Sequence, residues 1–397
     1  MRIDVDRLIE ACGDGSREAG ITVHTLLEPL AGPAAPVKPA VYAGGRFQED
    51  ERWWGDPPER TRVVVIDNVP SQANRLEAAL EGLRPALGLP EVVLDLTGIE
   101  TLPSHLPRRL SGFRFPHRHA DAYLRDAMLN DQPFPRTPVG SAIVEATAEE
   151  PTPLFQWFPQ ALLFGYWQSH LGKRRTQAKL ARSWVSEIAG YAPAREGEWT
   201  RVLGLKGDPL NLSVDEPVSY QEDDLLADWQ IVEQGQKSGG RRQHESLSKI
   251  GHGQVPVSLQ DAALAPVSFR SIEQRATVSF AGLRRVHCRD HEASAAGRAL
   301  LVALGLVAHL AAFGRAFSLR SGCDLRPVRA HWRWLGAEGE EELEPPSPEE
   351  AVDLFRACRR RAEAAGLTAG GGWDGEPLVV MPGPSLARAI TATWRVG

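Results

Sequence analysis

The sequence predicts an α+β fold, and three observations lead to that prediction. Segments with strand patterns and segments with helix patterns are interspersed along the 397 residues. They do not alternate in the strict βαβα order that builds a doubly wound parallel sheet. A hydrophobic content of 42% and a charged content of 24% are typical of a globular chain with a large core.

The expected elements follow from local patterns. Continuous β-branched runs such as RVVVID indicate buried strands, and apolar residues three and four apart indicate helices. In the first half we expect a helix within Met1–Ala19, strands at Thr22–Leu27, Arg62–Asp67 and Glu91–Leu96, and helices at His119–Met128 and Val139–Glu149. In the second half we expect a strand or hairpin at Val267–Phe280, a helix at Glu292–Phe313, a strand through Trp332 and Trp334, a helix at Ser347–Ala365 capped by Ser347, a strand at Pro377–Met381 and a helix at Ser385–Thr393.

Charge, hydropathy and cysteine content limit the classes of function. The formal net charge is −6, so any contact with a polyanion must come from local basic clusters. Met1–Glu10 lacks the apolar core of a signal peptide, and Ala299–Phe313 is shorter than the roughly 20 residues that span a bilayer. The 4 cysteines lie far apart, which favours free thiols in a reducing compartment. We therefore expect a cytoplasmic protein.

The stretch Gln160–Tyr191 combines an apolar run with a cluster of cations. Ala161–Trp167 has the length and composition of a buried strand, and Lys179–Gly190 has the apolar spacing of a helix. The cations occur with no acidic residue before Glu187 and are Lys173, Arg174, Arg175, Lys179 and Arg182. Such a cluster fits a polyanion, and a solvated basic helix face is the alternative.

A second candidate site follows the strand Arg62–Asp67. There Ser71 can cap a helix whose first turn carries Gln72, Asn74 and Arg75. Amide and guanidinium groups beside the free N–H groups of a helix N-terminus suit phosphate or ribose. An ordinary capped helix without a ligand is the alternative.

A third candidate is the weakly periodic segment 194–253, which carries cations on glycine-rich backbone. Its basic residues include Arg241, Arg242 and Lys249, and Gly251 and Gly253 flank His252. Long segments of this kind are functional loops or plain surface loops.

No pattern in the sequence indicates catalysis. Gly172-Lys173-Arg174 is not a P-loop, because Arg174 stands where Ser or Thr must bind magnesium. His287 and His291 would share a face only on a helix and have no second ligand pair. We therefore expect a protein that is not an enzyme and needs no cofactor or metal.

Several motifs, taken in order, resemble one protein family. The chain is similar to the backbone subunit of type I-G (formerly I-U) CRISPR effector complexes, or Cascades, a member of the RAMP superfamily. The motifs are IDNVPSQANRLE (Ile66–Glu77), DAYLRD (Asp121–Asp126), ALLFGYWQS (Ala161–Ser169), ARSWVSEIAGY (Ala181–Tyr191), KIGHG (Lys249–Gly253) and LRSGCDL (Leu319–Leu325). The ends 1–61 and 328–397 carry no matching motif.

The resemblance implies an RRM-like (ferredoxin-like) palm with an inserted thumb or finger segment. On this basis residues 1–193 and 254–335 form the palm, residues 194–253 the thumb, and residues 336–397 a helix–strand–helix extension packed on the palm. The residues expected to bind RNA are Ser71, Gln72, Asn74, Arg75, Gln168, Ser169, Lys173, Arg174, Arg175, Lys179, Arg182, Arg241, Arg242, Lys249, His252 and Arg320.

The resemblance also implies a function in antiviral defence. Copies of such a subunit polymerise along the spacer of a CRISPR RNA and present it for pairing with target DNA. The other implied partners are the large subunit, the guide-processing subunit and a recruited helicase-nuclease. Two alternatives stay open: a metal-independent CRISPR endoribonuclease that uses His252 or His170 for acid–base chemistry, and a stand-alone single-strand RNA-binding protein.

Overall fold

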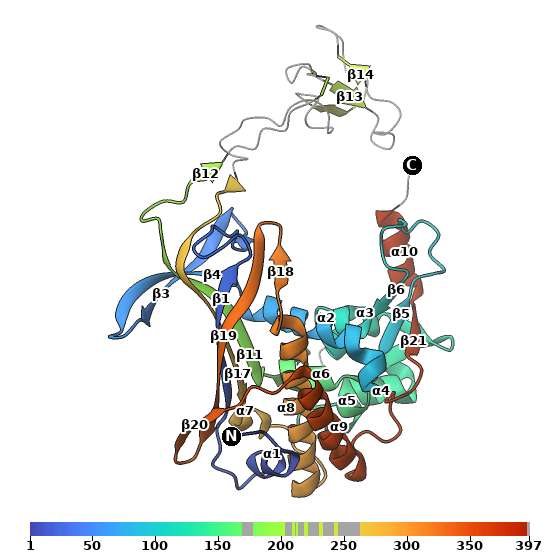
Figure 1. Ribbon diagram of the computed structural model, residues 1–397. Helices are drawn as coiled ribbons and strands as arrows, with labels where there is room; N and C mark the ends of the chain where they lie inside the picture. The colour runs from blue at the N-terminus through green and yellow to red at the C-terminus, as the bar shows by residue number, and fades with distance from the viewer. Residues whose placement is uncertain are drawn as a thin grey trace.

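A large antiparallel sheet, a layer of helices and a smaller sheet make up the computed structural model (Figure 1). The structure describes residues 1–168, 178–202, 209–210, 212, 218–220, 230–232, 242–244 and 263–394. The large sheet has the spatial order β18 (Phe317–Arg320), β19 (Cys323–Gly336), β1 (Gly20–Pro29), β17 (Phe269–Ser279), β11 (Trp184–Pro193), β4 (Glu59–Asp67), β3 (Arg46–Trp54) and β2 (Val41–Tyr42), with β20 (Gly339–Leu343) paired to β19.

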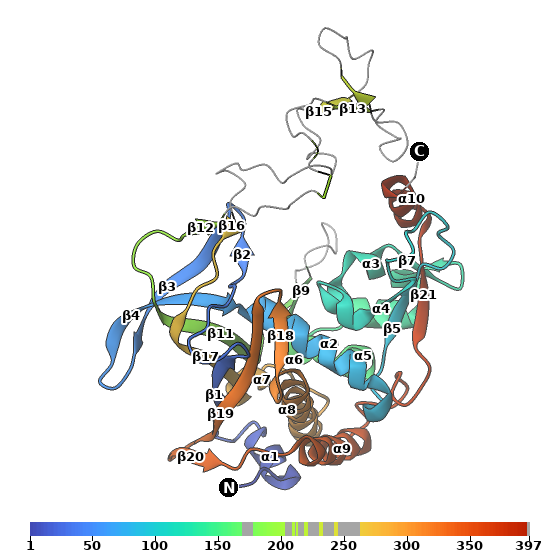
Figure 2. The same cartoon turned by 45° about the horizontal axis from the view of Figure 1, so that its top comes forward.

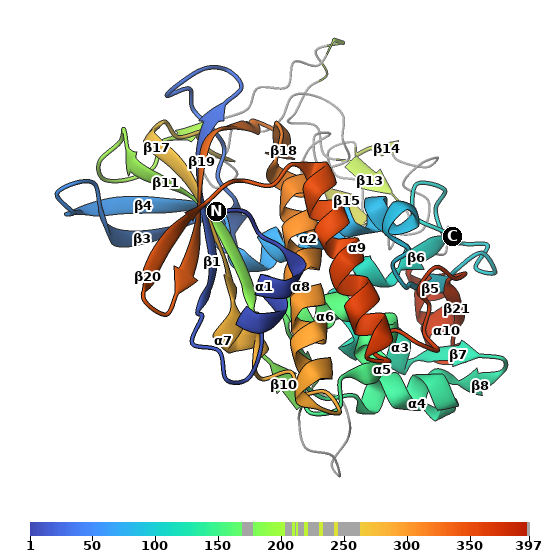
Figure 3. The ribbon, with the colours of Figure 1, turned by 60° about the horizontal axis from the view of Figure 1, so that its bottom comes forward.

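One face of the large sheet is covered by helices (Figure 3). In sequence, α2 (Val69–Leu87) lies between β4 and β11, and α8 (His291–Phe313) lies between β17 and β18. Helices α1 (Val5–Ala11), α6 (Pro159–Phe164) and α9 (Pro348–Ala364) pack against α8, and the single-turn helix α7 (Phe280–Leu283) follows β17 directly. Because the strands alternate, the side chains that they turn toward these helices form the core, among them Ile21, Val23, Trp184, Ile188, Val278 and Trp334.

The smaller sheet lies beyond the helices and includes the C-terminal strand. Its order is β6 (Arg109–Ser111), β5 (Val92–Asp95), β21 (Leu378–Pro382), β7 (Ala127–Leu129) and β8 (Gln132–Pro133), and only the β5–β21 pair is parallel. The short helices of this region are η1 (Gly112–Arg114), η2 (Arg118–Ala120), α3 (Ala122–Arg125), η3 (Phe134–Arg136), α4 (Pro138–Glu145), α5 (Thr152–Trp157) and α10 (Pro384–Thr393). The last part of the chain is thus built into the fold by strand pairing.

The strongest sequence patterns correspond to the observed elements. The strands predicted at Thr22–Leu27 and Arg62–Asp67 and the helix predicted at Glu292–Phe313 are confirmed as β1, β4 and α8. Ser347 caps α9 in a full capping box, as predicted. By length and composition α8 could cross a membrane, but 83% of its most apolar window is buried inside the protein.

The central stretch Gln160–Tyr191 was predicted with the wrong secondary structure. Ala161–Trp167 is divided between α6 and the strand β9 (Tyr166–Gln168), and Gly165 separates them with a φ of +77°. Lys179–Gly190 is not a helix; its residues belong to β10 (Ala178–Leu180) and β11. The apolar spacing of this segment fits both the helical and the strand period. Pairing of β11 with β17 and β4 within the sheet makes it a strand.

Three further helix predictions need correction. The predicted helix His119–Met128 is divided among the end of η2, the single turn α3 and the start of β7, and the helix predicted at Val139–Glu149 ends at Glu145. Asn68, not Ser71, caps α2: its side chain accepts a hydrogen bond from the Ser71 backbone N–H at 3.2 Å. Pro70 fits the first turn of that helix, which therefore begins earlier than the Ser71 cap implies.

The segment between β11 and β17 leaves the large sheet. Its strand β12 (Arg201–Val202) pairs with β16 (Ala263–Leu264), and β13 (Val218–Tyr220) pairs with β14 (Gln230–Ile231) and β15 (Arg242–His244). These strands form sheets separate from the large one (Figure 2). Most of the predicted thumb, 194–253, lies outside the described residues.

Close packing of α8 on β11 gives a first prediction. A Cβ at Gly305 would lie 2.4 Å from Cε3 of Trp184, so Gly305→Ala should lower the free energy of unfolding by roughly 1–3 kcal/mol. Gly82→Ala in α2 is the matched control, because nothing lies within 4 Å of its Cβ. Helix propensity alone should make that variant about 0.5–1 kcal/mol more stable. Urea unfolding measures the stability of both variants. If Gly305→Ala stabilised the protein as much as Gly82→Ala does, the close packing of α8 on β11 would be contradicted.

Candidate nucleic-acid interface

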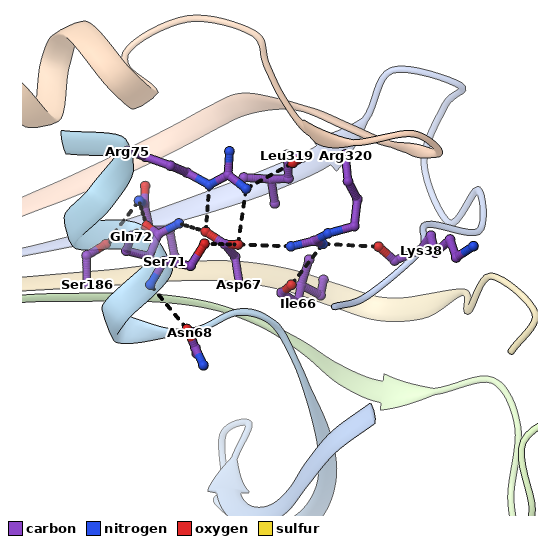
Figure 4. A network of polar contacts seen from close by, with 11 residues as sticks. Lys38, Ile66, Asp67, Asn68, Ser71, Gln72, Arg75, Ser186, Leu319 and Arg320 are labelled. Atoms are coloured by element: carbon purple, nitrogen blue, oxygen red, sulfur yellow. Dashed lines mark hydrogen bonds and ion pairs between the residues drawn. The ribbon is translucent and has the colours of Figure 1, made fainter. Parts of the chain in front are cut away.

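The end of β4 holds a buried carboxylate that collects four side chains (Figure 4). Asp67 is 0% exposed. Its carboxylate accepts hydrogen bonds from Ser71 Oγ at 2.8 Å and Gln72 Nε2 at 2.5 Å. Two guanidinium groups complete the set: Arg75 Nε lies 2.9 Å from Oδ2 and Arg320 Nη2 lies 2.9 Å from Oδ1. We call these five residues the Asp67 cluster.

Each arginine of the Asp67 cluster also binds backbone carbonyls. Arg75 Nη2 donates to the carbonyl of Leu319 at 2.9 Å. Arg320 Nη1 donates to the carbonyls of Ile66 and Lys38, at 3.0 and 3.2 Å. The cluster therefore joins β4, the start of α2, β18 and the loop before β2.

Gln72 extends the network into the core beneath the large sheet. Its Oε1 accepts hydrogen bonds from Ser186 Oγ and Gln274 Nε2, both at 2.8 Å. All three side chains are buried. A buried amide needs its partners to offset desolvation, so this part of the network has a structural function. Gln72 is thus held inside the RNA-free protein, and its contact with RNA stays a prediction.

The surface of the Asp67 cluster carries excess positive charge. One carboxylate faces two guanidinium groups, and the Arg75 and Arg320 side chains are 28% and 25% exposed. Asn74 is exposed on the neighbouring turn of α2. This edge can accept an anion at Arg75, Arg320 and Asn74, while Ser71 and Gln72 orient the cluster from within.

A second group of predicted residues lies on the hairpin of β9 and β10. Lys179 is exposed, and its Nζ lies 5.7 Å from the ring centroid of Trp167. Arg182 is exposed just after β10. Gln168 is 4% exposed in the RNA-free protein, and its contact with RNA stays a prediction. The alternation of the hairpin turns Gln168 inward and Trp167 outward.

The remaining predicted residues belong to the two segments that follow β9 and β11. Arg242 belongs to β15. The others lie outside the described residues and are Ser169, Lys173, Arg174, Arg175, Arg241, Lys249 and His252. The histidine of the endoribonuclease alternative, His170, lies there too.

A buried ion pair holds the base of the hairpin. Arg118 donates to both carboxylate oxygens of Glu77, at 2.7 and 2.8 Å, and its Nη1 donates to the carbonyl of Gly165 at 2.9 Å. Burial raises the pKa of Glu77 although Arg118 opposes the shift. Burial also lowers the pKa of His119 to about 3, so a neutral imidazole packs against Tyr166.

Sequence reasoning missed two residues of this surface. Trp167 was expected in a buried strand, but its side chain is 57% exposed. Arg285 is exposed, and its Nη2 donates to the carbonyl of Ala181 at 3.2 Å. The alternation that exposes Trp167 extends over only three residues, which is too short a pattern to predict from the sequence. The contact of Arg285 with Ala181 spans 104 positions and has no local sequence signal.

The Asp67 cluster gives a second prediction. Asp67→Asn removes the charge that Arg75 and Arg320 share, so the variant should lose roughly 2–4 kcal/mol of unfolding free energy in urea. Asp324→Asn is the matched control, since the Asp324 side chain is exposed and the described residues offer it no ion pair. A loss below about 0.5 kcal/mol for Asp67→Asn would show that the cluster does not stabilise the fold.

Comparisons with known proteins agree with the motifs. Residues 21–194, a little under half of the chain, match the family model described as CRISPR-associated protein GSU0053. The crystal structure of Thermofilum pendens Csc2 aligns over 99% of this chain and 93% of that chain, with 10% sequence identity and a TM-score of 0.28. That superposition is too loose to establish a common fold. No curated protein sequence matches the chain. Residues 21–194 are therefore similar to a family of CRISPR-associated proteins, in agreement with the resemblance that the motifs indicated.

Proposed function

We propose that the chain is a non-catalytic backbone subunit of a type I-G Cascade in the cytoplasm, and that it coats the spacer of a CRISPR RNA. The observation that carries the proposal is the family match over residues 21–194. That range contains β1, β4, α2 and the β9–β10 hairpin, together with most of the predicted RNA-binding residues that the structure describes. Its partners would be further copies of itself, the large subunit, the guide-processing subunit and a helicase-nuclease, with target DNA reached through the guide.

The strand order supports an RRM-like palm. Four neighbouring strands of the large sheet follow the order β19-β1-β17-β11. Helix α2 precedes β11 and helix α8 precedes β19 in sequence, and both lie on the same face (Figure 3). Strands β1, β11, β17 and β19 with these two helices give the β-α-β-β-α-β succession of a ferredoxin-like unit. Strands β2, β3 and β4 widen that unit at one edge. We propose residues 194–253 as the thumb and residues 336–397 as an extension of the palm.

The distribution of cations supports RNA coating without sequence readout. Such binding needs contacts to phosphate and 2′-OH groups, which arginine and lysine provide whatever the base. The Asp67 cluster offers an excess of positive charge at one edge, and the β9–β10 hairpin offers Lys179 and Arg182. The segment that joins β9 and β10 adds Lys173, Arg174 and Arg175 in its sequence.

The third prediction concerns those three cations. Replacing Lys173, Arg174 and Arg175 with alanine should weaken binding similarly for unrelated guide sequences. It should also reduce the slope of log K against log salt concentration by about 2, because each phosphate contact to a single strand contributes roughly 0.7.

The control for this variant removes the same charge elsewhere. Arg356, Arg360 and Arg361 are exposed on α9, and alanine at all three should leave the slope nearly unchanged. Filter binding at several salt concentrations measures both variants. An unchanged slope in the Lys173, Arg174 and Arg175 variant, with the protein still folded, would contradict the assignment.

A fourth prediction separates this function from the endoribonuclease alternative. The isolated protein should leave a repeat-containing precursor RNA intact, because its sequence provides no nucleophile motif or metal-ligand set. Cleavage at a fixed position of the repeat that disappears in His252→Ala or His170→Ala would favour the enzyme. Denaturing gel analysis with a mock-purified control distinguishes these results.

A further inference from the structure

The β9–β10 hairpin presents an indole ring on a fixed support. Trp167 lies directly opposite Lys179 in the antiparallel register. The inner face of the same hairpin is buried, with Tyr166, Gln168 and Leu180 between 4% and 7% exposed. Alternation therefore places Trp167 and Lys179 together on the outer face.

Three contacts anchor the base of this hairpin. A Cβ at Gly165 would lie 2.6 Å from the carbonyl oxygen of Leu180, so only glycine allows the two segments to approach this closely. Arg118 holds the carbonyl of Gly165, and the Ser183 backbone N–H donates to the carbonyl of Leu163 at 2.9 Å. The indole is thus presented at a defined place, which lowers the entropy cost of binding to it.

The surroundings of Trp167 are basic. Lys179, Arg182 and Arg285 are exposed, and no carboxylate among the described residues lies within ion-pair distance of any of them. Glu77 acts electrostatically on Arg182, but both of its carboxylate oxygens are bound by Arg118. Arg285 donates hydrogen bonds to the carbonyls of Ala181 and Gly282, which are uncharged acceptors.

A second exposed tryptophan provides the contrast. Trp53 on β3 is 73% exposed, but the cations beside it are paired with acids. Its cross-strand neighbour Arg60 pairs with Glu51, and Arg52 pairs with Asp50 and Glu187. Cations that carboxylates already neutralise attract a phosphate chain weakly, whereas an aromatic ring among unpaired cations combines the two contacts that hold single-stranded nucleic acid. This difference in charge selects Trp167 and identifies the ligand class.

We propose that Trp167 is a base-stacking platform of the RNA-binding surface, with Lys179, Arg182 and Arg285 bound to the phosphates on either side of the stacked base. The proposal rests on the RNA-binding function proposed above. The Lys179 ammonium rests against the indole in the free protein and is released toward a phosphate when a base covers the ring. Stacking uses the π-face that every base has, so the platform accepts any guide sequence.

The test compares Trp167→Ala with Trp53→Ala, using unstructured single-stranded RNA and the same RNA with its bases removed. Trp167→Ala should raise Kd for the intact RNA roughly 5- to 100-fold, as expected for the loss of one stacked base. Its salt slope should stay that of the wild type, because the phosphate contacts remain. Trp53→Ala should bind like the wild type, and Trp167→Phe should recover part of the loss.

The abasic RNA isolates the stacking contribution. It should bind the wild type more weakly than intact RNA does, whereas Trp167→Ala should discriminate less between the two. If the wild type binds intact RNA and Trp167→Ala binds it with the same Kd, the stacking platform is wrong, but the proposed RNA coating is not affected. No RNA binding by the wild type would overturn the proposed function itself. Light scattering provides a further check: a loss of self-association in RNA-free Trp167→Ala would assign the indole to a protein interface and overturn the proposal.

Discussion

The carboxylate of Asp67 is the interaction on which the arrangement of this molecule depends most. It ends a central strand, lies fully buried, and is shared by guanidinium groups from α2 and β18. Because a buried charge without partners is strongly unfavourable, Arg75 and Arg320 must stay in place. Their remaining N–H groups then fix the carbonyls of Leu319, Ile66 and Lys38. One buried acid thereby sets the relative positions of the strand ends that form this edge of the sheet.

The cations of the β9–β10 hairpin lie apart from carboxylates, unlike most of the described arginines of this acidic protein. Most described arginines face carboxylates, as in the pairs of Arg52 with Glu187 and Arg118 with Glu77. The outer face of the β9–β10 hairpin differs, because the described residues give its cations no acidic partner. A net charge of −6 is therefore compatible with binding a polyanion on one face. Acidic surfaces elsewhere remain available to other subunits.

The sequence predicted the elements whose patterns admit one interpretation. Arg62–Asp67 could only be a strand, and the long apolar run of α8 only a buried helix. Lys179–Gly190 fitted both helical and strand periods, and only pairing with β17 reveals the strand. The partnership of Arg320 with Asp67 spans 253 positions and had no local signal, although both residues lay in motifs that suggested function. Gln72 was expected to contact a ligand because its amide lies in the first turn of a helix at the end of a core strand. In the structure that amide accepts a hydrogen bond from Ser186 instead, as a buried amide needs a partner.

The central claim is that copies of this chain coat a guide RNA without reading its bases. The most direct measurement is nuclease footprinting of the CRISPR RNA in a complex assembled with this subunit, carried out with two unrelated spacers. The account predicts protection at regular intervals along the spacer, with the same spacing for both sequences, and loss of that pattern when this subunit is omitted. Protection confined to one sequence or to one end of the guide, or recovery of the complex without CRISPR RNA, would contradict it.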